Sequence, residues 1–190
     1  MPSVVMLLRH AEKPLGEGPP HGVTIDGAPD PESLTPRGWQ RAGALVGLFV
    51  PDPSDGRGPR LPTPTHLFAS QVGPRSSSQR PRETLVPLSE RLGLAVDSRF
   101  RKEELEELVR AVRLIDGVVL IAWEHHLLPS LANMLMGDAS SVPQIWPDDR
   151  YDVVWVVEDT GLGNGRGFRD VPEMLLAGDQ PGPIHPAGPT

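Results

Sequence analysis

The sequence contains no cysteine, and this absence excludes several kinds of site. Without thiols the chain can form no disulfide bond and no thiolate metal centre, and it has no cysteine nucleophile. A chain without disulfides suits a reducing compartment, so we expect a cytoplasmic location. The early apolar run of residues 4–8 is far shorter than a membrane span and lacks the basic flank of a signal peptide. We therefore expect no membrane association.

Positive charge is also in short supply. The 18 Lys and Arg residues are outnumbered by 25 Asp and Glu residues, which gives a formal net charge of −7, and the basic residues form no run. Binding to a nucleic-acid backbone requires a basic face. We therefore expect no nucleic-acid partner, whereas a small anionic ligand remains compatible with this composition if a few arginines converge locally.

The length and the turn-forming residues predict the domain organisation. A chain of 190 residues is long enough for one domain with a sizeable core and too short for two ordinary ones. The 23 prolines and 20 glycines indicate long irregular connections. The sequence thus predicts a single domain over residues 1–190, with a Gly/Pro-rich tail from about residue 161.

Apolar patterning predicts strands that alternate with helices. Apolar runs with β-branched residues are typical of buried strands, and they occur at residues 3–8, 118–122 and 151–157. Residues 66–70 are a further, short strand candidate. Apolar residues at helical spacing predict helices over residues 36–49, 81–92, 105–112 and 128–135. This alternation predicts an α/β fold: a three-layer sandwich in which a mostly parallel central sheet has helices on both faces.

Three polar residues directly follow predicted strands. His10, Ser70 and His125 each come at or just after the carboxyl end of a strand. In parallel α/β sheets, ligands bind in the crevice beyond the carboxyl ends of the strands. The sequence therefore predicts that these three residues open on the same crevice.

The residues around His10 favour phosphoryl transfer. Without metal or cysteine, such a site needs a neutral nucleophile, cationic groups around the phosphate oxygens and an acid for the leaving group. Arg9 directly precedes His10. A nearby guanidinium disfavours the imidazolium form and so keeps the imidazole nucleophilic, and its planar fork matches phosphate oxygens.

Four motifs, in chain order, resemble those of one enzyme superfamily. They are Leu8-Arg9-His10-Ala11-Glu12; Leu34-Thr35-Pro36 with Gly38, Gln40 and Ala42; Phe68-Ala69-Ser70 followed by Arg80-Pro81 and Thr84; and residues 119–122 followed by His125. The first resembles the strand-end Arg-His-Gly-Glu signature of the histidine phosphatase superfamily, also called phosphoglycerate mutase-like. The others resemble that superfamily's next helix start, its serine with an Arg-Ala-x-x-Thr helix start, and the strand before its second histidine. Ala11 replaces the usual glycine, and His126 follows where glycine is usual.

The resemblance implies a role for each site residue. It implies that His10 accepts the phosphoryl group and that Arg9, Arg80 and His125 hold the phosphate oxygens, with no cofactor and no metal. His126 is the alternative to His125 as the pocket histidine. The superfamily's general acid has no clean counterpart in this sequence, and Glu103 and Glu104 stand closest to it in chain order.

The resemblance also implies the activity. We expect a metal-independent phosphatase that acts on a phosphomonoester, either a small phosphorylated molecule or a phosphoprotein, through a phosphohistidine intermediate. The alternatives are a non-catalytic phospho-ligand binding or scaffold protein on the same fold and a phosphomutase. A mutase usually needs extra covering segments, and this chain is short for them.

A metal site is a further interpretation of one short run of residues. Glu124, His125 and His126 carry carboxylate and imidazole groups that bind zinc well. Adjacent side chains on an extended chain point in opposite directions, however, and so cannot easily share one ion. On that premise the sequence disfavours a metal site here.

Overall fold

The computed structural model describes residues 2–50, 60–73, 76–161 and 165–184. Its strands are β1 (Val4–Arg9), β2 (His66–Ala69), β3 (Val96–Asp97), β4 (Val118–Trp123), β5 (Val153–Asp159) and β6 (Arg166–Pro172). Its helices are α1 (Pro36–Phe49), α2 (Arg80–Leu92), α3 (Leu105–Arg113), the short 3₁₀ helix η1 (His125–Leu127) and α4 (Leu128–Met136). The predicted helices and strands are all present, with boundaries shifted by two residues or fewer.

The six strands form one sheet in the order β3-β2-β4-β1-β5-β6. The β1–β4, β2–β4 and β2–β3 pairs are parallel, whereas β5 is antiparallel to both β1 and β6. Arg9 of β1 pairs with Trp123 of β4, and Ala69 of β2 pairs with Ala122 of β4. The three central strands therefore end at the same level, and the predicted mostly parallel sheet is confirmed.

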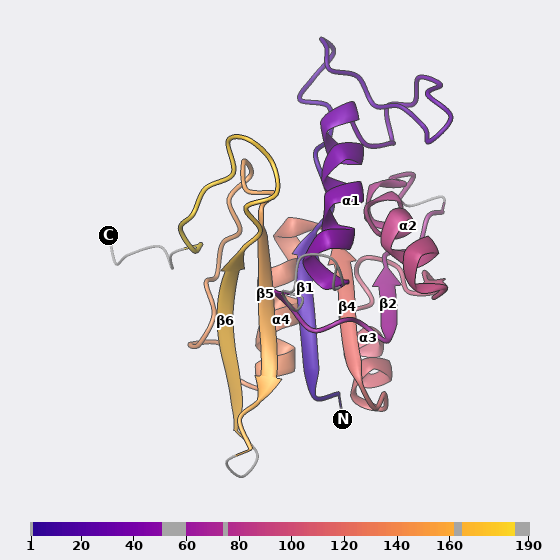
Figure 1. The fold of residues 1–190 in the computed structure, drawn as a ribbon. Coiled ribbons are helices and arrows are strands. Elements are labelled where there is room, and N and C mark those ends of the chain that lie inside the picture. The colour runs from indigo at the N-terminus through magenta and orange to yellow at the C-terminus, as the bar shows by residue number, and fades with distance from the viewer. Residues whose placement is uncertain (1, 51–59, 74–75, 162–164, 185–190) are drawn as a thin grey trace.

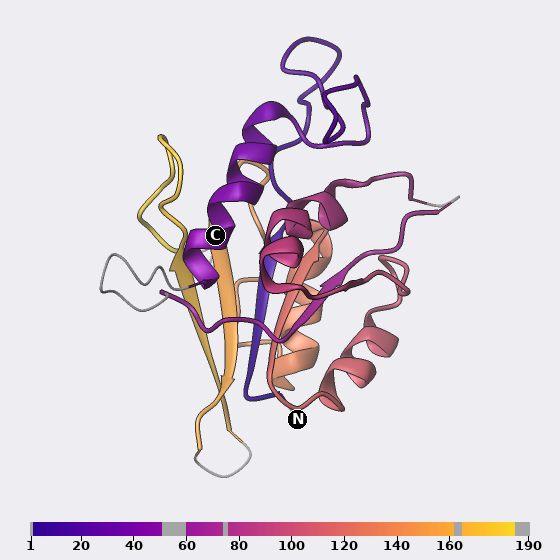
Figure 2. The same ribbon diagram turned by 45° about the vertical axis from the view of Figure 1, so that its right-hand side comes forward.

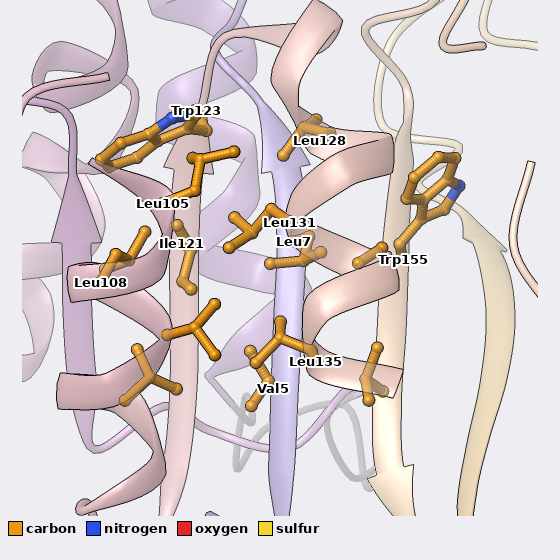
Figure 3. Close-up of a cluster of buried hydrophobic side chains, with 14 of the residues drawn as sticks. Val5, Leu7, Leu105, Leu108, Ile121, Trp123, Leu128, Leu131, Leu135 and Trp155 are labelled. Carbon is orange, nitrogen blue, oxygen red and sulfur yellow. The ribbon is translucent and has the colours of Figure 1, made fainter. Parts of the chain in front are cut away.

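Helices cover both faces of this sheet, as predicted (Figures 1 and 2). Because successive strand residues point to opposite faces, each strand contributes to two separate cores. Val5 and Leu7 of β1 pack beneath α3 and α4, as Figure 3 shows. Met6 and Leu8 pack with apolar residues of α1 and α2 on the other face. Burial on both faces explains why the strand reads as a continuous apolar run.

Helix ends follow local sequence signals. Thr35 caps α1 by accepting a hydrogen bond from the backbone N–H of Gly38, and Pro36 occupies the first helical position. Gly93 and Gly137 end α2 and α4 with φ of 67° and 82°. Glycine adopts this left-handed conformation without the steric cost that a Cβ imposes.

The segment predicted to be a tail contains β6, which pairs with β5 along seven residues. The sequence of β6 mixes Gly, Arg and Asp with only two large apolar residues, Phe168 and Val171, so it lacks the apolar signature of a buried strand. An edge strand of this kind is stabilised by backbone pairing with β5 rather than by full burial. Strand β3 was also not predicted, because two residues are too few to show an apolar pattern. Residues 185–190 of the predicted tail lie outside the described residues.

Within the described part of the chain, no helix is both long enough and apolar enough to cross a membrane.

Candidate active site

A cavity of about 170 Å³ opens where β1, β2 and β4 end. His10, Ser70 and His125 all line it, as their positions after the predicted strands indicated. The backbone N–H of His10 donates to the carbonyl of Trp123 at 3.1 Å, which extends the β1–β4 pairing by one residue, to His10. The register of the parallel strands thus brings the two histidines to one cavity.

His10 has a defined ring orientation. It is only 5% exposed, and its Nδ1 lies 2.8 Å from the carbonyl oxygen of Ala11. A carbonyl oxygen only accepts hydrogen bonds, so Nδ1 carries the proton and donates. In the neutral ring, Nε2 is then left with a free lone pair. This is the tautomer that a nucleophile attacking through Nε2 requires.

The surroundings of His10 keep this ring neutral. The pKa of His10 is lowered from its ordinary 6.5 to about 3, mainly by burial and also by the positive charges of Arg9, Arg80 and Lys13, against the hydrogen bond to Ala11, which raises it. Desolvation and like charges both disfavour an imidazolium. The neutral ring is therefore the form of His10 present at neutral pH.

The start of α2 is tied directly to residues 10–13 after β1, the His10 loop. The hydroxyl of Thr84 accepts a 2.9 Å hydrogen bond from the backbone N–H of Ala11 and donates a 2.7 Å bond to the carbonyl of Arg80. Thr84 is fully buried. The spacing between Arg80 and Thr84 is one helical turn, so one hydroxyl links the arginine's backbone with the residue after His10.

The α1 helix start holds the same loop from the other side. The backbone N–H of Thr35 donates to the carbonyl of Glu12 at 3.0 Å. A Cβ built on Gly38 would lie 2.5 Å from that same carbonyl oxygen, closer than real Cβ contacts allow. Glycine at this position therefore lets the first turn of α1 pack against the backbone of the His10 loop.

Arg80 reaches the cavity wall from the first residue of α2. Its guanidinium donates to the carbonyl of Ser33 at 3.3 Å and to the hydroxyl of Ser78 at 3.3 Å, and it also bonds the carbonyl of Pro31. These contacts fix the plane of the guanidinium beside the cavity. An oriented arginine fork is the group best suited to bind two phosphate oxygens together.

Two lysines add positive charge to the cavity wall. Lys13 ends the His10 loop, and Lys102 lies in the segment before α3. The indole N–H of Trp123 donates to the carbonyl of Lys102 at 3.1 Å, so the end of β4 holds this segment over the site. With Arg80, the lysines make the cavity locally positive in a chain whose net charge is −7. Such a local field attracts an anionic ligand.

His125 follows β4 and is 2% exposed. Its Nε2 lies 2.6 Å from Oδ1 of Asp148, whose side chain is 84% exposed. Burial lowers the pKa of His125, and the positive charges of Arg9 and His126 act in the same direction, while Asp148 opposes them. Asp148 thereby orients the imidazole on the cavity wall.

The structure does not bring Arg9 to the cavity wall together with His10, Arg80 and His125. Its Nη1 donates to the carbonyl of Asp148 at 2.6 Å, and its Nη2 donates to the hydroxyl of Tyr151 at 3.0 Å. Its guanidinium carbon also lies 3.8 Å from the centroid of the Tyr151 ring, a cation–π contact. In this geometry, Arg9 holds the segment before β5 and acts on His10 through its charge.

The carboxyl group in the cavity wall is not one of those that the sequence suggested. Glu104 accepts hydrogen bonds from Arg101 just before α3, Glu103 is exposed, and neither lines the cavity. Among the described residues, Glu124 supplies the carboxyl group of the wall, with an oxygen 2.9 Å from Nζ of Lys102. The sequence signal available was its position directly after the end of β4 and directly before His125. His126 also lines the cavity.

The sequence and the fold were compared with those of known proteins. No protein-family model matches the sequence, and no curated protein matches it. Among solved structures, the chain is similar to the alpha-ribazole phosphatase from Shigella flexneri, with a TM-score of 0.52 at 13% identity over 89% of this chain and 96% of that one. It is similar to a candidate phosphohistidine phosphatase, SixA, from Agrobacterium tumefaciens, with a TM-score of 0.50 at 15% identity over the same shares of both chains. This chain has the histidine phosphatase fold.

The histidine phosphatase fold agrees with the motifs found in the sequence. At 13–15% identity, the similarity reports the fold and not the reaction. Evidence on the reaction comes from the cavity of this chain, in which His10, Arg80 and His125 come from three different segments. The function therefore has to be argued from those side chains.

Proposed function

We propose that this protein is a phosphatase that hydrolyses a phosphomonoester through a phosphohistidine intermediate on His10. The observation that carries the proposal is the buried, neutral His10 ring, whose Nδ1 donates to Ala11 and whose Nε2 is thereby free for attack. The positive groups that share its cavity support a phosphate ligand.

In the first step, the Nε2 lone pair of His10 attacks phosphorus and the ester P–O bond breaks. Arg80 and His125 hold the nonbridging oxygens, and Lys13 and Lys102 neutralise charge nearby. Such fixed positive groups stabilise a transition state in which charge spreads over the phosphoryl oxygens. The attack by His10 needs no metal ion, because the imidazole is nucleophilic in its neutral form.

Glu124 is the proton donor in this proposal, once the bound phosphate group has drawn Lys102 out of its ion pair with Glu124 and the carboxylate has taken up a proton. It gives a proton to the leaving oxygen as the P–O bond breaks. In the second step, the Glu124 carboxylate takes a proton from the water that attacks the phosphohistidine. The P–N bond then breaks, inorganic phosphate leaves, and His10 returns to its neutral form. A carboxyl group that alternates between acid and base satisfies both steps.

The size of the cavity bears on the substrate. A volume of about 170 Å³ is well below the roughly 300–1,000 Å³ of sites that enclose a small-molecule ligand. The cavity suits a phosphoryl group, while the rest of the substrate lies outside it. Both a small phosphate ester and a phosphoprotein side chain meet this condition.

The proposal is tested by hydrolysis of a generic phosphomonoester by purified protein in the presence of chelator. We expect turnover with chelator present and none in the His10→Ala variant. A strict requirement for Mg²⁺ or Zn²⁺ contradicts the mechanism.

The Glu124→Gln variant should lose most activity toward esters with poor leaving groups and much less toward esters with good ones, and Glu103→Gln is its matched control.

One observation favours a second function. The guanidinium of Arg9 is engaged by Asp148 and Tyr151 instead of lining the cavity. A site with one arginine fewer at the phosphate fits a phospho-ligand binding or scaffold protein. Binding of phosphate or vanadate without hydrolysis of any ester tested supports this second function over the first.

A further inference from the structure

The chain turns at the end of β4 and does not stay extended. His125 and His126 lie in the 3₁₀ helix η1, and their ring centroids are 3.8 Å apart with the planes tilted by 37°. The sequence argument against a shared metal ion assumed an extended chain, on which neighbouring side chains diverge. That premise is wrong here, because the helical turn brings the two imidazoles together.

A carboxylate reaches the same place from a distant part of the chain. Asp148 lies in the segment before β5, and its Oδ1 is 2.6 Å from Nε2 of His125. The backbone of Asp148 is held by Arg9, a buried residue whose Nη1 donates to its carbonyl. The backbone of Asp148 is therefore held by a buried contact, while its carboxylate is open to solvent.

We propose that His125, His126 and Asp148 bind a Zn²⁺ ion at the rim of the cavity. One ligand atom from each residue lies within 4.8 Å of the others. Two ligands about 2.1 Å from a tetrahedral zinc are about 3.4 Å apart, so these atoms need only small movements to surround the ion. Asp148 is 84% exposed and free to move by that amount.

The donor set selects the metal. Two imidazole nitrogens and one carboxylate oxygen are ligands typical of zinc, whereas Mg²⁺ prefers an octahedron of oxygens. His126 and Asp148 are exposed, so an ion enters directly from solvent. Three protein ligands leave a fourth position for water or a phosphate oxygen.

Zinc at this site should inhibit hydrolysis reversibly. A bound ion occupies the His125 nitrogen that faces Asp148 and turns the ring away from its role at the phosphate oxygens. This effect on activity rests on the proposed function, whereas the binding of zinc does not. Binding and inhibition are therefore measured separately.

Binding is measured by titrating metal-free protein with Zn²⁺ in competition with a chromophoric chelator, and again with Mg²⁺. We expect one Zn²⁺ per chain and no comparable binding of Mg²⁺. His126→Ala and Asp148→Asn should each weaken zinc binding at least about tenfold, the loss typical when a metal site's support is removed. His66→Ala and Asp149→Asn are the matched controls, because both residues are exposed and outside the cluster.

The outcomes separate cleanly. Zinc affinity that is unchanged in both His126→Ala and Asp148→Asn, or lost equally in the controls, overturns the site. Zinc binding that follows the expected pattern in a protein with no phosphatase activity keeps the site and removes the proposed function. Hydrolysis that zinc does not slow, despite site-specific binding, overturns the inhibitory role.

Discussion

The hydroxyl of Thr84 accepts a hydrogen bond from the backbone N–H of Ala11 at 2.9 Å, and so joins the first turn of α2 to the residue after His10. The same hydroxyl donates to the carbonyl of Arg80. One buried side chain thereby sets the position of Arg80 relative to His10.

Replacing Thr84 with Val should uncouple these two segments. Val has nearly the same shape but leaves the Ala11 N–H buried without a partner, which costs about 1–3 kcal/mol. We expect lower stability in denaturant unfolding and a reduced kcat with the phosphomonoester used above. Thr84→Ser keeps the hydroxyl and is the control. Equal loss in both variants indicates that the methyl group, and not the hydrogen bond, is what the site needs.

Gly38→Ala should destabilise the His10 loop. The added Cβ would lie 2.5 Å from the carbonyl oxygen of Glu12, so either the helix or the loop must move. Gly43 lies in the same helix with nothing within 4 Å of its Cβ position, so Gly43→Ala should instead stabilise by about 0.5–1 kcal/mol. Thermal unfolding of the two variants checks both signs. A stabilised Gly38→Ala protein is incompatible with the packing described.

Arg80→Lys keeps the positive charge but removes the guanidinium fork. Loss of one charged hydrogen bond to the transition state is worth about 1.5–3 kcal/mol, so kcat/KM should fall about ten- to hundredfold. Arg82 is exposed and lies two residues away on the same helix, and Arg82→Lys should leave kcat/KM unchanged. Wild-type kinetics in Arg80→Lys would transfer the phosphate-binding role to another cation of the cavity.

The low pKa of His10 predicts how its ring titrates. Burial and the nearby cations lower it to about 3, so the folded protein binds this proton less readily than the unfolded chain. The contribution of His10 to stability is therefore present above pH 6.5 and is lost as the pH falls toward 3. NMR of the histidine rings, with the His10 signal assigned by its loss in His10→Ala, should show a midpoint far below 6.5. A midpoint near 6.5 contradicts the buried neutral nucleophile.

The sequence predicted the buried parts of the fold well because burial leaves a strong pattern. The apolar runs of β1, β4 and β5 and the caps of α1 and α2 were visible without tertiary information. The edge strand β6 was not, since its pairing depends on β5 and its own residues carry little apolar signal.

The candidate site was predicted as far as strand order determines it. The carboxyl ends of β1, β2 and β4 had to meet, so the shared cavity of His10, Ser70 and His125 followed from topology. The placement of Arg9 did not, because it depends on a loop more than 130 residues away in the chain. The contact between the two imidazoles of η1 was also not predicted, because it depends on a local turn that the sequence pattern does not indicate.

The most direct test is to find the phosphoryl group on His10 during turnover. Phosphohistidine survives in alkali, so the reaction is quenched rapidly into base and the peptides are weighed by mass spectrometry. We expect about 80 Da, the mass of the added phosphoryl group, on the peptide that contains His10, and neither label nor hydrolysis in His10→Ala. In His125→Ala the label should form more slowly but still on His10. Label on the peptide that contains His125, or hydrolysis that survives in His10→Ala, contradicts the account.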